Sequence, residues 1–296
     1  EIRLSLVGSE MCIRDSPMTI AITGATGQLG RLAIAGLKAR GQSPIALVRD
    51  PAKAADLAVE ARAFDYKAVA SLAPALAGVT TLVLISSNDF DDRAGQHRNV
   101  VAAAKAAGVA RILYTSLLNA AESPMLLAAD HKATEEAILA SGLTYTILRN
   151  GWYTENHTGS LGGAIAAGAM IGSAGAGRFS SAARADYAEA IAATAATSGH
   201  DNAIYELAGD TAYSYADMAA EVSRLTGKTI PYNDLPPETY AGILQSFGLP
   251  EGFAHVLADS DVQAAKGALF DDSRTLSRLI GRPTTPFTAT VAAALA

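Results

Sequence analysis

His131 and Glu135 are the first residues whose types and spacing point to chemistry. They lie in LAADHKATEEA (127–137), an alanine-rich stretch that predicts a helix. Residues four apart share one helix face, so this spacing would bring an imidazole beside a carboxylate. The stretch alone leaves three interpretations open: a metal site, an acid/base pair, or the altered remnant of another catalytic pair.

A metal site is the least favoured interpretation, because two side chains are too few ligands and the other histidines lie at no supporting spacing. An acid/base pair stays open, since His131 could titrate near neutrality. A hydrogen bond along the helix face, with no catalytic part, is the interpretation that we favour.

A glycine loop is the second chemical signal. TGATGQLG follows an apolar strand and opens a helix, the context that dinucleotide-binding loops require. Its first glycine would permit the tight turn, the second the approach of a pyrophosphate, and the third close helix packing. The helix-start N–H groups would then face the phosphates. We expect cofactor contacts along the whole loop: Gly24, Ala25, Thr26, Gly27, Gln28, Leu29 and Gly30.

The end of the second strand selects the dinucleotide. Arg49 ends IALVR, where NAD-specific sites carry an acidic residue, and Lys53 follows one helical turn later. A guanidinium binds the 2′-phosphate of NADPH, which a carboxylate would repel. Asp50 is better explained as the cap of a helix that starts at Pro51. The sequence therefore predicts NADPH as the cofactor.

Alternating strands and helices must position these residues. Short apolar strands are expected at 19–23, 45–49, 61–66, 81–86, 110–116 and 143–150, with helical stretches between them. This rhythm predicts an α/β fold, a Rossmann-type doubly wound parallel sheet. Ligands bind at the carboxyl ends of such strands. We expect Ser86, Ser87, Thr115, Ser116 and the Asn150–Tyr153 segment around the nicotinamide and the group that receives its hydride.

The regular alternation of strands and helices ends after Asn150. A Gly/Ala-rich stretch (159–177) precedes a helix after Asp186, a strand at 203–207 and a helix at 214–227. We therefore expect an NADP-binding domain at 18–150 and a smaller C-terminal α+β substrate domain at 151–296, with some of its elements returning to the sheet.

Composition excludes several classes of function. Half of the 296 residues are hydrophobic, and the formal charge is −6 with no basic run, so a nucleic-acid surface is not expected. No apolar stretch is long enough to span a membrane. Residues 1–17, which hold the only cysteine, Cys12, match an extraneous leader better than a signal peptide; a native disordered leader is the alternative. A cytoplasmic protein without disulfides is expected.

Five segments carry a family resemblance: TGATGQLG, LVRDPAK, YTSLL, LRNGWYTEN and FDDSRTLSRLIG. Together they resemble the NmrA-like, atypical short-chain dehydrogenase/reductases, and among them the quinone-reducing members. The resemblance implies an NADPH-binding enzyme that reduces a small-molecule quinone by two electrons. Gly24–Gly30, Arg49 and the strand-end serines would hold NADPH, and Asn150, Gly151, Trp152, Tyr153 and Asn156 would surround the quinone.

Ordinary short-chain dehydrogenases carry Tyr-x-x-x-Lys where this chain has His131-x-x-x-Glu135. Glu135 cannot replace the lysine cation, but a hydroquinone anion, with a pKa near that of a phenol (~10), needs only water or one donor. We expect the Asn150 amide to be that donor and Tyr153 or Trp152 to stack on the ring. A non-catalytic NADP(H) sensor is the alternative, and a sugar-nucleotide epimerase is disfavoured. The sequence leaves the natural quinone and any homo-oligomer open.

Overall fold

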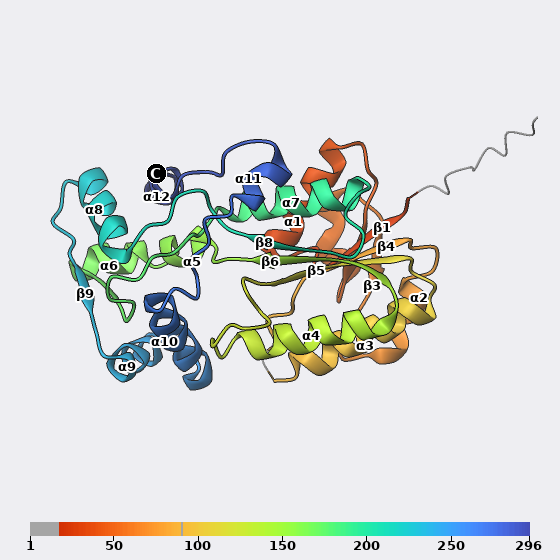
Figure 1. The fold of residues 1–296 in the computed structure, drawn as a ribbon, viewed down its shortest axis with the longest axis horizontal. Helices are drawn as coiled ribbons and strands as arrows, with labels where there is room; N and C mark the ends of the chain where they lie inside the picture. Colours follow the sequence, from red (N-terminus) through yellow and green to blue (C-terminus); the bar gives the residue numbers. More distant parts are fainter. Residues whose placement is uncertain (1–17, 90) are drawn as a thin grey trace, which may run out of the picture.

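A parallel sheet forms the centre of the molecule (Figure 1). The computed structural model describes residues 18–89 and 91–296, so the leader and Cys12 lie outside the described residues. Within these residues, seven strands pair in the order β3-β2-β1-β4-β5-β6-β8, and every neighbouring pair is parallel. This is the doubly wound sheet predicted from the sequence. The strands are β1 (Ile20–Thr23), β2 (Ile45–Val48), β3 (Ala61–Ala63), β4 (Thr81–Leu84), β5 (Arg111–Leu117), β6 (Thr144–Asn150) and β8 (Ala203–Leu207).

β3 is shorter than the expected strand at 61–66. Phe64 N still bonds to the Val48 carbonyl at 2.8 Å. Asp65 then accepts a hydrogen bond from Lys67 N at 3.0 Å, and this turn ends the strand.

Helices cover both faces of the sheet (Figure 1). Since side chains alternate along a strand, Leu113 of β5 packs on one face while Ile112 and Tyr114 pack on the other. The first face holds α1 (Gln28–Ala39), α7 (Arg184–Ala196) and α11 (Thr275–Ile280). The second face holds α2 (Leu72–Ala75), α3 (Arg93–Ala106) and α4 (Ala128–Ser141). The short 3-10 helices are η1 (Pro51–Leu57) and η2 (Val69–Ser71), and Asp50 caps η1 as predicted.

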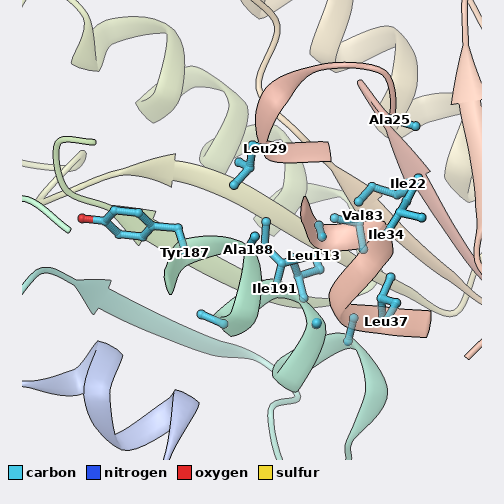
Figure 2. Close-up of a cluster of buried hydrophobic side chains, with 14 of the residues drawn as sticks. Ile22, Ala25, Leu29, Ile34, Leu37, Val83, Leu113, Tyr187, Ala188 and Ile191 are labelled. Atoms are coloured by element: carbon cyan, nitrogen blue, oxygen red, sulfur yellow. The ribbon is translucent and has the colours of Figure 1, made fainter. Parts of the chain in front are cut away.

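Close packing of α1 on α7 builds the core of the first face. Figure 2 shows Ala188 and Ile191 of α7 beside Leu113 of β5 and Leu37 of α1. Gly36 makes this approach possible, because a Cβ there would lie 2.9 Å from the Cβ of Ala192. Residues more than 150 apart in the sequence therefore form one interface.

Residues 151–296 divide between the sheet and a separate group of elements. α7, β8 and α11 pack on or in the sheet, so the 203–207 segment does return to it. The others form what we call the cap, which packs around an apolar cluster that also includes Leu117 of β5 and Ala128 of α4, and around a smaller second cluster. The cap comprises α5 (Thr154–Thr158), α6 (Leu161–Ala167), β7 (Met170–Gly172), α8 (Tyr215–Thr226), β9 (Tyr232–Asp234), α9 (Pro237–Ser246), α10 (Glu251–Ala265) and α12 (Phe287–Leu295).

Helix termini in the cap follow the sequence signals. Ser214 caps α8 with its side chain and shares a capping box with Asp217, and Gly227 ends the helix in the left-handed conformation. In the part of the chain that the structure describes, no helix is both long and apolar enough to cross a membrane.

Candidate functional site

The glycine loop joins β1 to α1 in a tight turn. Gly24 has a φ of +60°, and its carbonyl accepts a hydrogen bond from Gly27 N at 2.9 Å. A Cβ on Gly30 would collide with that same carbonyl and would lie 2.8 Å from the Cα of Ala25. The turn therefore requires glycine at its first and third positions for backbone reasons, as predicted.

The amino terminus of α1 is open to a ligand. Its N-cap residue is Gly27, which has no side chain with which to cap the helix. By contrast, both carboxylate oxygens of Glu155 accept from Arg184 N at 2.9 Å at the start of α7. Gly24, Gly27 and Gln28 are exposed, whereas Ala25, Leu29 and Gly30 are buried, so the exposed half of the loop faces solvent. Free N–H groups and a positive helix end fit a dinucleotide phosphate.

Two cations follow β2 at the same edge of the sheet. Arg49 and Lys53 are both exposed. Within the described residues Arg49 makes no hydrogen bond or ion pair, so its guanidinium is available to a ligand. Residues that fit the 2′-phosphate of NADPH are therefore present.

The strand-end serines bond through their backbones to neighbouring elements. Ser86 N donates to Thr115 Oγ1 at 3.0 Å, and Ser87 N donates to His97 Nε2 at 3.0 Å. Burial lowers the pKa of His97 to about 3, with the charge of Arg93 adding to the effect. A neutral His97 thus holds the turn after β4 in place.

His131 is buried and bonds to two residues other than Glu135. Its Nδ1 lies 2.8 Å from the Tyr114 hydroxyl, and its Nε2 lies 3.3 Å from Arg93 Nη1. A guanidinium only donates, so Nε2 is the acceptor and the ring is neutral. Burial lowers the pKa of His131 well below its ordinary value, and the charges of Arg93 and His97 lower it further. The expectation that His131 titrates near neutrality is therefore wrong.

Glu135 is engaged in an ion pair with the sheet. Its carboxylate accepts two hydrogen bonds from Arg149 of β6, at 2.9 and 2.6 Å, and one from Ser116 Oγ at 2.5 Å. His131 and Glu135 form no hydrogen bond to each other. Our prediction of a hydrogen bond between them along the helix face is therefore wrong as well. Within 18–89 and 91–296 no group of three or more His, Cys, Asp or Glu side chains could hold a metal.

Asn150 ends β6 with a side chain that lacks partners. It is only 3% exposed, yet neither its Nδ2 nor its Oδ1 makes a hydrogen bond to the described residues. Leaving a buried polar group unpaired costs roughly 1–3 kcal/mol. Such a group fits a ligand that supplies the missing bonds, and it lies at the edge where ligands bind in this fold.

The three residues after Asn150 point to different places. Gly151 is structural, because its N bonds to Leu207 O at 2.7 Å and a Cβ would lie 3.0 Å from the Tyr187 hydroxyl. Trp152 packs on the cap cluster, whereas Tyr153 packs on the first face of the sheet, edge-on to Tyr187 with ring centres 5.2 Å apart. The two aromatic rings therefore do not form one stacking surface.

Arg184 is the residue near the candidate site that sequence reasoning missed. Its guanidinium carbon lies 4.8 Å from the centre of the Tyr153 ring, and its Nη2 donates to Asn156 Oδ1 at 3.3 Å. Because α7 leads into the parallel strand β8, it begins at the carboxyl edge of the sheet. The sequence signal that could have found it is a basic residue at the start of a helix on this edge of the sheet.

Comparisons with known proteins identify the family of this chain. A family model described as NAD(P)H-binding matches residues 24–198. Quinone oxidoreductase 2 of Escherichia coli (strain K12) is 52% identical over 271 residues, which cover 90% of this chain and 95% of that protein.

Solved structures share the fold of this chain. The NADPH-dependent quinone oxidoreductase of Escherichia coli complexed with NADPH has a TM-score of 0.91 and 50% identity, covering 94% of this chain and all of that chain. The Citrobacter sp. triphenylmethane reductase complexed with NADP(H) has a TM-score of 0.88 and 38% identity, covering 93% of this chain and 100% of that chain. By its matched span, its doubly wound sheet and its glycine loop, the chain belongs to the NAD(P)H-binding family.

Proposed function

We propose that this chain is an NADPH-dependent quinone oxidoreductase that reduces quinones by two electrons to hydroquinones, acting in the cytoplasm. The observation that carries the proposal is the buried, unpartnered amide of Asn150 at the carboxyl edge of the sheet. The likeness to Escherichia coli quinone oxidoreductase 2 over 90% of the chain supports the choice of substrate class.

The cofactor site is assigned to the edge formed by β1, β2 and β4. The open N–H groups at Gln28–Gly30 bind the pyrophosphate, and Arg49 with Lys53 binds the 2′-phosphate. Ser86 and Ser87 flank the nicotinamide side of the site. When bound, NADPH supplies the hydride for the reduction.

Asn150 acts on the quinone. Its Nδ2 donates to a quinone oxygen, where negative charge develops, and its Oδ1 accepts from the hydroxyl of the product. A donor already aimed at the developing charge stabilises the transition state without reorganisation. The product anion is phenol-like, with a pKa of ~10, so a strong acid is not needed. We place the quinone against Asn150 and Trp152, with Asn156 at the exposed rim.

A non-catalytic NADP(H) sensor is the second candidate. The observation that favours it is that His131 and Glu135 are both engaged in bonds to the sheet, which leaves neither as a catalytic acid. Both candidates bind NADPH, and only the enzyme turns it over.

NADPH oxidation followed by absorbance, with and without a small benzoquinone, tests the proposal. We expect quinone-dependent oxidation with NADPH and a much slower reaction with NADH. Tight NADPH binding in a titration with no quinone-dependent oxidation would favour the sensor.

A further inference from the structure

Three side chains from different elements meet beside the end of β6. The Asn150 amide neighbours the Tyr153 hydroxyl and lowers its pKa, although it makes no hydrogen bond to the described residues. The guanidinium carbon of Arg184 lies 4.8 Å from the centre of the Tyr153 ring. Thus one phenol, one unpartnered amide and one cation share this corner of the structure.

This corner lies at the edge that holds the glycine loop. α1 leaves the carboxyl end of β1, and α7 begins at the same edge because it leads into the parallel strand β8. The two helices pack together, and Tyr153 packs on the cluster that contains Leu29 of α1 (Figure 2 shows Leu29 and Tyr187 of this cluster). Tyr153 therefore lies on the face of the sheet that α1 covers and follows the carboxyl end of β6, the edge at which ligands bind in this fold.

The surroundings of Tyr153 keep its hydroxyl protonated. Burial raises the pKa of Tyr153, while the Asn150 amide and the Arg184 charge lower it and the Glu155 carboxylate raises it. Glu155 also accepts from the backbone N of Arg184 through both oxygens, and this fixes the first residue of α7, whose side chain covers the ring. The remaining aromatic neighbour, Tyr187, carries no charge at neutral pH because burial raises its pKa well above the ordinary value. Tyr153 is thus a neutral proton donor.

We propose that Tyr153 is the acid of the quinone reduction, with Arg184 as its positioning residue. The inference rests on the proposed function. After one hydride (two electrons and one proton) has reached the quinone, one oxygen of the hydroquinone monoanion carries the negative charge. The Tyr153 O–H bond breaks and an O–H bond forms at that oxygen. The tyrosinate then recovers its proton from water. The ordinary pKa values of a phenol and a hydroquinone are similar (~10). Burial raises the pKa of Tyr153, and the charge of Arg184 lowers it, which favours release of the proton to the anion.

Tyr153→Phe is the direct test, because the variant keeps the ring against Tyr187 and Arg184 and removes only the hydroxyl. Tyr145→Phe is the matched control, since Tyr145 lies near the opposite end of β6. We expect Tyr153→Phe to lower kcat for benzoquinone by more than about tenfold, below the ~10²–10⁴-fold of stronger acid/base cases because the anion is delocalised. NADPH affinity and melting temperature should stay unchanged. We expect the wild type to show a solvent isotope effect on kcat, and Tyr153→Phe to lose it.

Arg184 is tested by a pair of variants. Arg184→Gln should lower kcat while Arg184→Lys restores most of it, because the cation and not the exact shape favours proton release. A kcat for Tyr153→Phe within tenfold of the wild type, or a loss matched by weaker NADPH binding, would overturn the assignment. A wild type that oxidises no NADPH in the presence of quinone would refute the proposed function itself. An active wild type with an equally active Tyr153→Phe variant would refute only the role of Tyr153.

Discussion

Glu135 and Arg149 form a bidentate ion pair between α4 and β6, with Oε1 2.9 Å from Nε and Oε2 2.6 Å from Nη2. Both side chains are largely buried, and Arg149 also bonds to Glu206 of β8 at 2.8 Å. The pair therefore ties a helix of the second face to two neighbouring strands. His131, one turn earlier on α4, reaches β5 instead and bonds to Tyr114. The two residues share a face of the helix without sharing a function.

Glu135→Gln should destabilise the protein. Removing one member of a buried ion pair leaves the other uncompensated, which typically costs about 3–5 kcal/mol. We expect the lower end of that range, because Arg149 keeps Glu206. Urea unfolding measures the change, and Glu136→Gln, at the exposed neighbouring position, should stay within about 0.5 kcal/mol of the wild type. Equal stabilities of the two variants would contradict the structural role.

His131→Ala should reduce stability more than turnover. Its two buried hydrogen-bond partners, Tyr114 and Arg93, would lose an interaction worth roughly 1–3 kcal/mol. We expect kcat for benzoquinone to fall less than about tenfold, below the effect of a positioned acid or base. Steady-state kinetics measures the effect on turnover, and thermal unfolding measures the effect on stability. A loss above about a hundredfold with unchanged melting temperature and NADPH affinity would instead give His131 a catalytic role.

Arg49→Ala should change cofactor choice. Loss of a charge-assisted hydrogen bond to the 2′-phosphate should weaken NADPH binding by roughly 1.5–3 kcal/mol and leave NADH nearly unaffected. Titration of both dinucleotides measures this difference. Arg98→Ala is the matched control, since Arg98 is also an exposed arginine, on α3. Equal weakening of NADPH and NADH would count against the 2′-phosphate role.

Asn150→Ala should lower activity without lowering stability. Loss of a donor from well-studied oxyanion sites costs on the order of 10²–10³-fold, and a delocalised phenolate should need the donor less. We therefore expect kcat to fall about 10–100-fold. The folded protein loses no hydrogen bond of the Asn150 side chain to the described residues, so the free energy of unfolding should hold or rise. A clear loss of stability with normal kcat would make Asn150 a structural residue.

Asp261 should make stability depend on pH. It lies buried on α10, and burial raises its pKa from 3.8 to about 6, while hydrogen bonds from Ser173 N and Tyr215 Oη oppose the shift. The folded state therefore binds the proton more tightly than the unfolded state. Below about pH 4 this proton binding adds about 3 kcal/mol to the free energy of unfolding. The contribution is lost between pH 4 and 6 and is absent at higher pH.

Asp261→Asn should remove that dependence. An asparagine can accept from Ser173 N and donate to Tyr215 Oη, so it keeps both partners without a charge. The difference in unfolding free energy between the variant and the wild type, measured in urea from pH 4 to 7.5, should shift in favour of the variant as pH rises. Parallel curves for the two proteins would contradict the raised pKa.

The sequence by itself determined the doubly wound sheet, the glycine loop and the cofactor class. Each of these depends on local patterns. Apolar strands between helices predict a parallel sheet, and Gly24 and Gly30 are required by a single turn of backbone. Arg49 was predicted to bind the 2′-phosphate because it lies at the end of the second strand, and that role stays a prediction. These features use residues that are near one another in the chain.

Only the tertiary structure decided which side chains meet. The strand order places Arg149 under Glu135, 14 residues away, and the return of α7 places Arg184 over Tyr153, 31 residues away. Helical spacing predicted that His131 and Glu135 share a face, but not that each would bond to a different strand. The pairing of buried polar groups depends on which strands are neighbours and how deeply they are desolvated, and no local pattern encodes either property.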